Sequence, residues 1–229
     1  LNDLKSRFIS MASHEFRTPL TTILSSASLI NEYNNTEAAD KREKHINRIK
    51  SAVNNLNDIL SDFLSISKLE EGRVHAEYRT FDLKALAEEV INELQITAKA
   101  GQQIVHTHNG GTDVYLDIKL LKNILINLTS NAMKFSPENR NIDLRTRVDE
   151  YTISVEVEDH GMGISEEDQK HLFERFYRGK NATNIQGTGL GLHIVGNYVD
   201  LMKGHIILHS ELNRGTVIKI TFPNQHNPA

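Results

Sequence analysis

Glycine is absent from the first 71 residues of this chain, and Pro19 is the only proline among them. All 13 glycines follow, beginning at Gly72. A stretch that lacks glycine and repeats apolar residues every three or four positions predicts long helices, because those positions share one helix face. The sequence therefore predicts two domains of different architecture, residues 1–71 and residues 72–229.

Two long helices are predicted in the first domain, joined by a turn at residues 33–36. Apolar residues recur in the first helix at Phe8, Ala12, Phe16, Leu20, Ile23, Ala27 and Ile30. In the second helix they step by three and four, as in a coiled-coil seam, at Ile46, Ile49, Val53, Leu56, Leu60 and Phe63. A helical hairpin of this kind usually completes its core by pairing with a second copy. We therefore expect a four-helix bundle and a homodimer through residues 1–71.

Helices and strands are mixed in the second domain. Asp82 and Asp117 have the character of helix N-caps, and Gly101 is expected to end the helix that Asp82 begins. A third helix is expected after Gly189. Strands are predicted at residues 103–108, 142–148, 152–159, 206–210 and 216–222. The whole chain is thus expected to be α+β, a helical hairpin followed by an α/β sandwich with a mixed sheet.

Composition excludes several classes of protein. The 229 residues carry a net charge of −4 and no cysteine, which argues against a nucleic-acid partner and excludes disulfide scaffolds and thiolate metal sites. No run approaches the roughly 18 apolar residues that a membrane span needs. The chain begins with Leu1, so we expect a cytoplasmic piece of a longer protein, whose anchoring in a membrane stays open.

His14 lies two positions before the apolar Phe16, about 200° around the helix, and is expected to face outward. Thr18 shares its face, Glu15 is its neighbour, and Pro19 is expected to bend the helix just beyond. An exposed imidazole beside a carboxylate suits a nucleophile, although the spacing alone favours a solvated histidine on a helix surface. The string His14–Leu20, HEFRTPL, resembles the phosphoacceptor box of sensor histidine kinases. That resemblance implies that His14 is phosphorylated, that Glu15 acts as acid or base, and that Thr18 serves a reverse phosphatase reaction.

The helix after Asp117 places Asn127, Asn131 and Lys134 within about 60° of one another. Amide oxygens can bind Mg²⁺, and an ammonium can meet a phosphate. A solvated helix face would show the same spacing.

Asp159 falls on the apolar parity of its predicted strand, so its carboxylate is expected to be partly buried and to need hydrogen-bond donors. An adenine amino group is one such donor, and a turn cap is the simpler alternative. Gly161 and Gly163 follow, where a ligand or backbone can approach closely.

A second glycine segment, Gly187-Thr188-Gly189-Leu190-Gly191, opens the last predicted helix. Backbone N–H groups at a helix N-terminus attract phosphate, but the pattern is neither a P-loop nor a dinucleotide fingerprint. Between the two glycine segments, LFERFYRG contains Phe176 and Arg178. The polar residues 180–186 are predicted to form a mobile lid.

The order of these segments carries more information than any one of them. NLTSNAMKFSP, DHGMGI, LFERFYRG and GTGLGL resemble the N box, first glycine box, F box and second glycine box of the histidine-kinase (GHKL-type) ATP domain. The resemblance implies that Asn131 binds Mg²⁺, that Asn127, Lys134 and Arg178 approach the phosphates of ATP, and that Asp159 reads adenine. It adds to the nucleotide site Gly161, Gly163, Phe176, Gly187, Thr188, Gly189, Leu190 and Gly191.

Two alternatives to phosphotransfer are weighed. ATPases and chaperones with this ATP fold place a glutamate four residues before the Mg²⁺-binding asparagine, where this chain has Asn127, a poor general base. A scaffold with a degenerate ATP site is disfavoured by the intact Asn131, Asp159 and glycine boxes. We therefore expect ATP-dependent phosphorylation of His14, followed by transfer to an aspartate on a response-regulator receiver domain.

Overall fold

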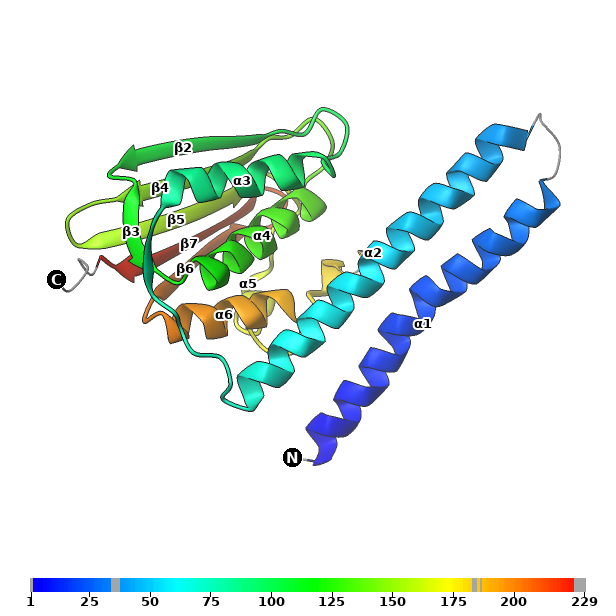
Figure 1. The fold of residues 1–229 in the computed structure, drawn as a ribbon, viewed down its shortest axis with the longest axis horizontal. Helices are drawn as coiled ribbons and strands as arrows, with labels where there is room; N and C mark the ends of the chain where they lie inside the picture. Colours follow the sequence, from blue (N-terminus) through cyan, green and yellow to red (C-terminus); the bar gives the residue numbers. More distant parts are fainter. Residues whose placement is uncertain (1, 34–37, 183–184, 186, 225–229) are drawn as a thin grey trace. The chain divides into compact units, whose positions relative to one another are not determined.

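The computed structural model separates the chain into two compact units, Leu1–Glu70 and Glu71–Ala229 (Figure 1). It describes residues 2–33, 38–182, 185 and 187–224, with side chains from Ala12 onward except that of His14. Among these residues, no helix combines the length and the apolar character that crossing a membrane requires.

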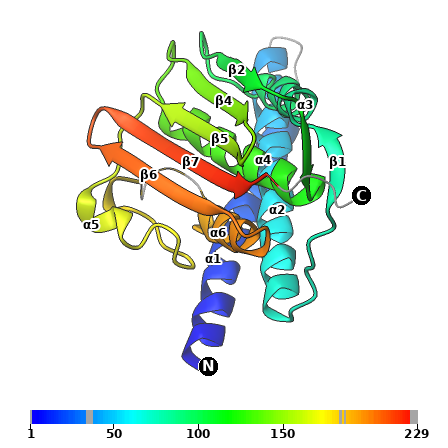
Figure 2. The same ribbon diagram turned by 90° about the vertical axis from the view of Figure 1, so that its left-hand side faces the viewer.

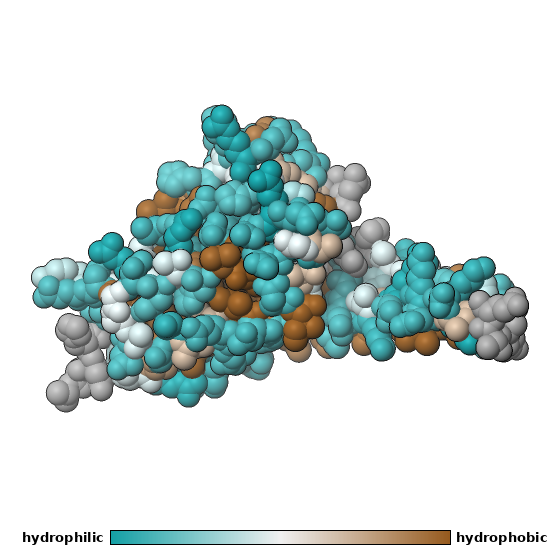
Figure 3. Space-filling model, turned by 90° about the horizontal axis from the view of Figure 1, so that it is seen from above, coloured by the Kyte–Doolittle hydropathy of each residue, from teal (hydrophilic) through white to brown (hydrophobic). Residues whose placement is uncertain are grey.

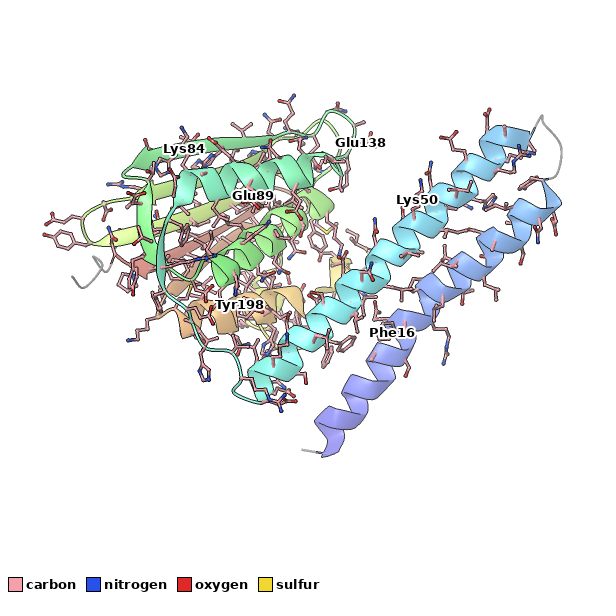
Figure 4. All side chains as sticks on the ribbon, viewed as in Figure 1. Phe16, Lys50, Lys84, Glu89, Glu138 and Tyr198 are labelled. Carbon is pink, nitrogen blue, oxygen red and sulfur yellow. The ribbon has the colours of Figure 1, made fainter. Side chains whose placement is uncertain are left out.

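The first unit is a hairpin of two long helices, α1 (Asn2–Glu32) and α2 (Ala39–Glu70). Helix α1 continues through Pro19, which is buried within it, and the bend expected there stays a prediction. Phe16 lies between the two helices in Figure 4, and its ring stacks on that of Phe63 with centroids 5.9 Å apart. Of the turn predicted at residues 33–36, only Tyr33 falls among the described residues.

The hairpin does not bury the whole apolar series predicted for α2. Its buried apolar residues in α2 are Ala52, Ile59, Phe63 and Ile66. A neighbouring set on the same hairpin remains exposed, and we call it the outer stripe: Leu20, Leu24, Ile46, Val53, Leu60 and Leu64. Hydrophobic atoms accordingly interrupt the hydrophilic surface of the hairpin in Figure 3. The predicted seam is therefore only partly buried: Phe63 is buried, but Ile46, Val53 and Leu60 are exposed. Residues three positions apart point about 60° apart on a helix, so the seam covers more than the face that meets α1.

The second unit contains a mixed five-stranded sheet with strand order β2-β4-β5-β7-β6. Strands β2 and β4 are parallel, and every other neighbouring pair is antiparallel. The strand bounds are Ile104–Gly110 for β2, Ile142–Val148 for β4, Thr152–Asp159 for β5, His205–Glu211 for β6 and Gly215–Pro223 for β7. A separate antiparallel pair joins β1 (Arg79–Asp82) to β3 (Asp113–Leu116).

Three helices pack on one face of this sheet, α3 (Leu83–Gln95), α4 (Ile118–Phe135) and α6 (Gly191–Leu201) (Figures 1 and 2). Buried and more exposed residues therefore alternate along the strands. In β5 the buried residues are Ile153, Val155 and Val157. Full burial of such a side chain contributes about 1.5–3 kcal/mol. The predicted α/β sandwich is confirmed.

Asp82 caps α3 by accepting a hydrogen bond from the Ala85 N–H at 2.8 Å, as predicted. Asp117 likewise caps α4, accepting from the N–H groups of Lys119 and Leu120. Helix α3, however, ends at Gln95, well before Gly101. The Gln95 side chain explains this difference, because its amide donates to the Gln102 carbonyl and accepts from the Ile104 N–H, which organises a loop before β2.

Candidate nucleotide site

Helix α4 has one buried face and one polar face. Leu121, Leu125 and Leu128 are buried toward the sheet, while Asn127, Asn131 and Lys134 are half-buried on the other side. The three polar residues occupy successive turns, as the sequence predicts. Packing of the leucines therefore sets the direction in which the polar side chains project.

The second glycine segment, residues 187–191, lies directly against this polar face. A Cβ atom added to Gly187 would be 2.5 Å from the Lys134 Nζ, and one added to Gly191 would be 2.5 Å from the Asn127 Oδ1. A side chain at either position would displace the end of the Lys134 or the Asn127 side chain. The structure thus brings together Asn127, Lys134 and both ends of the glycine segment.

The centre of this segment has a conformation that glycine adopts readily. Gly189 has φ +70°, and its carbonyl accepts a hydrogen bond from the Phe176 N–H at 3.1 Å. Leu190 is fully buried and its N–H donates to the Thr188 Oγ1 at 3.2 Å. Helix α6 then begins without a side-chain cap at its N-cap, Leu190. Backbone N–H groups at such a terminus attract anions.

Asp159 ends β5 with its carboxylate largely removed from solvent. Burial raises the pKa of Asp159, while hydrogen bonds from the Gly161 and Thr216 backbones act in the opposite direction. The Gly161 N–H donates to the Asp159 Oδ1 at 2.8 Å. A carboxylate at this depth is a strong acceptor for a ligand's N–H group.

The first glycine segment, residues 161–163, packs closely against backbone atoms of neighbouring elements. A Cβ atom at Gly161 would collide with the Phe135 carbonyl at the end of α4 and would lie 2.9 Å from the Asp159 Oδ1. Gly163 has φ +65° and adjoins the Glu211 carbonyl in β6. The end of β5 therefore lies beside the last turn of α4, the turn that carries Lys134.

Phe176 is a non-glycine residue with a positive φ of +62°. The Arg178 guanidinium donates to the carbonyls of Ala182 and Ile185, which fold the following loop back on itself. Part of the predicted lid, residues 183, 184 and 186, lies outside the described residues.

The candidate residues of the helical unit all lie on α1. Glu15 is half-buried and Thr18 is exposed, and the Thr18 carbonyl accepts from the Thr22 hydroxyl at 3.1 Å. His14 and Thr18 are four residues apart and share a helix face. The side chain of His14 lies outside those described.

One contact of the site was not foreseen from sequence. Thr216 in β7 pairs in register with Asp159, and its backbone helps to hold the carboxylate. Pairing between β5 and β7 joins residues nearly sixty positions apart, and a single sequence gives no local signal for it.

Two family models match the chain. The His Kinase A (phospho-acceptor) domain matches residues 4–72, and the histidine kinase-, DNA gyrase B- and HSP90-like ATPase matches residues 116–226. The second unit is therefore an ATP-binding domain of that group.

Individual proteins similar to this chain agree with the two family models. The chain is 32% identical to the circadian input-output histidine kinase CikA of Synechococcus elongatus, over 98% of this chain but 30% of that protein. Full-length ShkA, solved in complex with AMPPNP, has a TM-score of 0.68 at 25% identity, covering 97% of this chain and 47% of ShkA. The histidine kinase ThkA, solved in complex with the response regulator protein TrrA, has a TM-score of 0.71 at 24% identity and covers 98% of this chain and 62% of that one.

We predict that Gly189→Ala weakens the second unit and its site. The added Cβ would lie 2.8 Å from backbone atoms of Phe176 and Tyr177 in a left-handed conformation. We expect a loss of about 1–3 kcal/mol in unfolding free energy and at least about tenfold weaker binding of an ATP analogue, measured by urea denaturation and by titration.

Gly196→Ala is the matched control, because its Cβ would have only an ordinary contact, 3.7 Å from the Phe173 ring. Alanine favours a helix interior, so this variant should be as stable as the parent or slightly more stable. Equal behaviour of the two variants would contradict the geometry described for Gly189.

Proposed function

The chain belongs to the sensor histidine kinases, and on this premise we propose that its second unit transfers the γ-phosphoryl group of ATP to His14. One observation carries the proposal: a phosphoacceptor-domain match containing His14 and an ATPase-type match without a hydrolytic glutamate occur in the same chain. The chain spans only 30% and 24% of the lengths of the first two curated relatives, so the activity of the whole protein is part of this proposal.

We assign the phosphate-binding role to the contact between α4 and the second glycine segment. Lys134 supplies a positive charge beside Gly187, and the start of α6 supplies backbone N–H groups. The Asn127 amide donates to the Asn123 carbonyl at 3.0 Å, and its Oδ1 lies on the side of Gly191. Asn127 has no acidic group with which to activate water, which favours transfer over hydrolysis.

Asn131 lies between Asn127 and Lys134 on the same face of α4, and we assign it to Mg²⁺. Its amide oxygen is a suitable hard ligand, and Mg²⁺ usually takes few protein ligands together with phosphate oxygens and water. The amide oxygens on the polar face of α4 are therefore suitable ligands for Mg²⁺. Bound there, Mg²⁺ would neutralise charge on the phosphates, while Lys134 and the glycine segment orient them.

Asp159 is assigned to the adenine amino group. Its partial burial and hydrogen bonds from the Gly161 and Thr216 backbones fix the carboxylate at the end of β5. A fixed, partly buried acceptor selects for an N–H donor, because a base without one would leave the carboxylate unpaired.

On α1, His14 is the proposed nucleophile, through a ring nitrogen in its neutral form. Glu15, its neighbour, would accept the proton of the other ring nitrogen and so raise nucleophilicity. Thr18 is proposed to position water for dephosphorylation of the partner. These roles rest on the resemblance of residues 14–20 to the phosphoacceptor box.

We further propose that the chain forms a homodimer through residues 1–71. The outer stripe supports this, since its leucines and other apolar residues remain exposed on a hairpin that has already formed one apolar contact. A response-regulator receiver domain is the proposed second partner, as ThkA is solved with such a protein. Because the phosphoryl donor is ATP, we propose that these steps take place in the cytoplasm.

Incubation with labelled ATP and Mg²⁺ tests the central proposal. The parent chain should acquire label that is lost in acid, as expected of a phosphoramidate, and His14→Gln should acquire none. Binding of an ATP analogue should be unchanged in the variant, because His14 lies outside the ATP-binding unit. Equal, acid-stable label on both chains would refute the proposal.

The affinity for ATP should depend on pH through Asp159. Burial raises the pKa of this carboxyl, so it protonates at a higher pH than an ordinary aspartate. As pH falls through that pKa, the carboxyl loses acceptor capacity and ATP binding should weaken. Asp159→Asn should bind roughly tenfold more weakly at pH 7 and should lack this component of the pH dependence. If ATP affinity changed with pH in the same way for the parent and for Asp159→Asn, Asp159 would be excluded as the acceptor for the adenine amino group.

Leu24→Glu should separate the proposed dimer, because Leu24 is 70% exposed on the outer stripe and a charge there opposes its burial. Leu212→Glu is the matched control, with a leucine 50% exposed in the other unit. Light scattering at micromolar concentration should show a dimer for the parent and for the control, and a folded monomer for Leu24→Glu. A monomeric parent would overturn this part of the proposal.

A further inference from the structure

Asp168 is a buried carboxylate to which the proposed reaction assigns no role. It belongs to the short helix α5 (Glu166–Gln169), and its residue is only 2% exposed. Helix α5 is fastened to the sheet, because the Gln169 side chain donates to the Ser210 carbonyl of β6 at 2.9 Å. Asp168 is therefore an acidic group at a fixed position.

Three donors surround this carboxylate. The Tyr177 hydroxyl donates to its Oδ1 at 2.6 Å, the Ser165 hydroxyl donates to its Oδ2 at 2.9 Å, and the Lys180 backbone N–H also donates to it. These bonds, that of Tyr177 first, lower the pKa of Asp168. The same bond raises the pKa of Tyr177 to about 12. The pair is thus a carboxylate and a neutral phenol throughout the physiological range.

Two of the donors belong to one stretch of chain, which we call the F segment, residues 176–180. Tyr177 and Lys180 lie near its ends and converge on the same carboxylate. Arg178 lies between them. The 3₁₀ turn η2 (Lys180–Ala182) continues from the F segment.

The F segment also contacts the second glycine segment, residues 187–191. The Phe176 N–H donates to the Gly189 carbonyl, and Phe176 itself has φ +62°. A non-glycine residue persists in this conformation only where its surroundings hold it. Tyr177, the next residue, is the one that Asp168 binds. The Asp168 carboxylate and the Gly189 carbonyl thus hold the F segment at two consecutive residues, Tyr177 and Phe176.

We propose that Asp168 is a positioning residue for ATP, which through Tyr177 and Lys180 holds the F segment against the second glycine segment. This inference rests on the proposed function, because it takes the glycine segment as the phosphate-binding element. Removing the hydrogen bond between Tyr177 and Asp168 would let Phe176 leave the second glycine segment. The loss should concern the phosphates of ATP, since Asp159, on β5, is not part of this network.

Tyr177→Phe tests the proposal with the smallest change, because it deletes the hydroxyl and keeps the ring that packs on His171. Dissociation constants for ATP and for adenosine should be measured directly, together with thermal unfolding. ATP should bind at least about tenfold more weakly, while adenosine should bind within about twofold of the parent. Asp168→Asn should show the same selectivity, and the double variant should be no weaker than the weaker single variant.

Glu167→Gln is the matched control. It neighbours Asp168 but is exposed, and its carboxylate pairs with the Lys180 Nζ at the surface. It should change neither dissociation constant by more than about twofold. An ATP affinity that is unchanged in a folded Tyr177→Phe variant would overturn the proposal, as would equal weakening for ATP and adenosine. If the variants show this selective loss of ATP binding but the parent chain never phosphorylates His14, the proposed function is refuted and the role of Asp168 stands.

Discussion

The packing of α4 beneath the sheet is the interaction on which the nucleotide site depends. Burial of Leu121, Leu125 and Leu128 fixes the rotation of the helix, and this rotation turns its polar residues toward the second glycine segment. A side chain at Gly187 or Gly191 would displace the end of the Lys134 or the Asn127 side chain. Core packing and the proposed ligand binding therefore use different faces of one helix, so the core sets the direction of the polar side chains.

In the helical unit, too, different faces of the same helices have different roles. Its two helices contain more apolar residues than one hairpin contact can bury, and they divide these between an inner face and the outer stripe. The inner face, with the stacked rings of Phe16 and Phe63, holds the hairpin together. The outer stripe has a reason to exist only if something else covers it, which is why the proposed dimer concerns this unit.

Much of the architecture was predictable because it depends on local chemistry. The caps at Asp82 and Asp117, the β4–β5 hairpin and the polar face of α4 follow from short-range hydrogen bonding and periodicity. The end of α3 and the short elements β1, β3 and α5 were not predicted. They depend on single side chains, such as Gln95, or on pairing too short to leave a periodic pattern.

The sequence by itself determined which chemical groups are available: a histidine on a long helix, amides and a lysine at successive turns, an aspartate at a strand end and two glycine segments. Only the tertiary structure decided which of them meet. Asp159 and Thr216 are joined by strand pairing, and Asp168 and Tyr177 by a hydrogen bond that closes the loop after α5. The reason is physical: periodicity and capping act within a few residues, whereas contacts between distant segments arise only from the packing of whole elements.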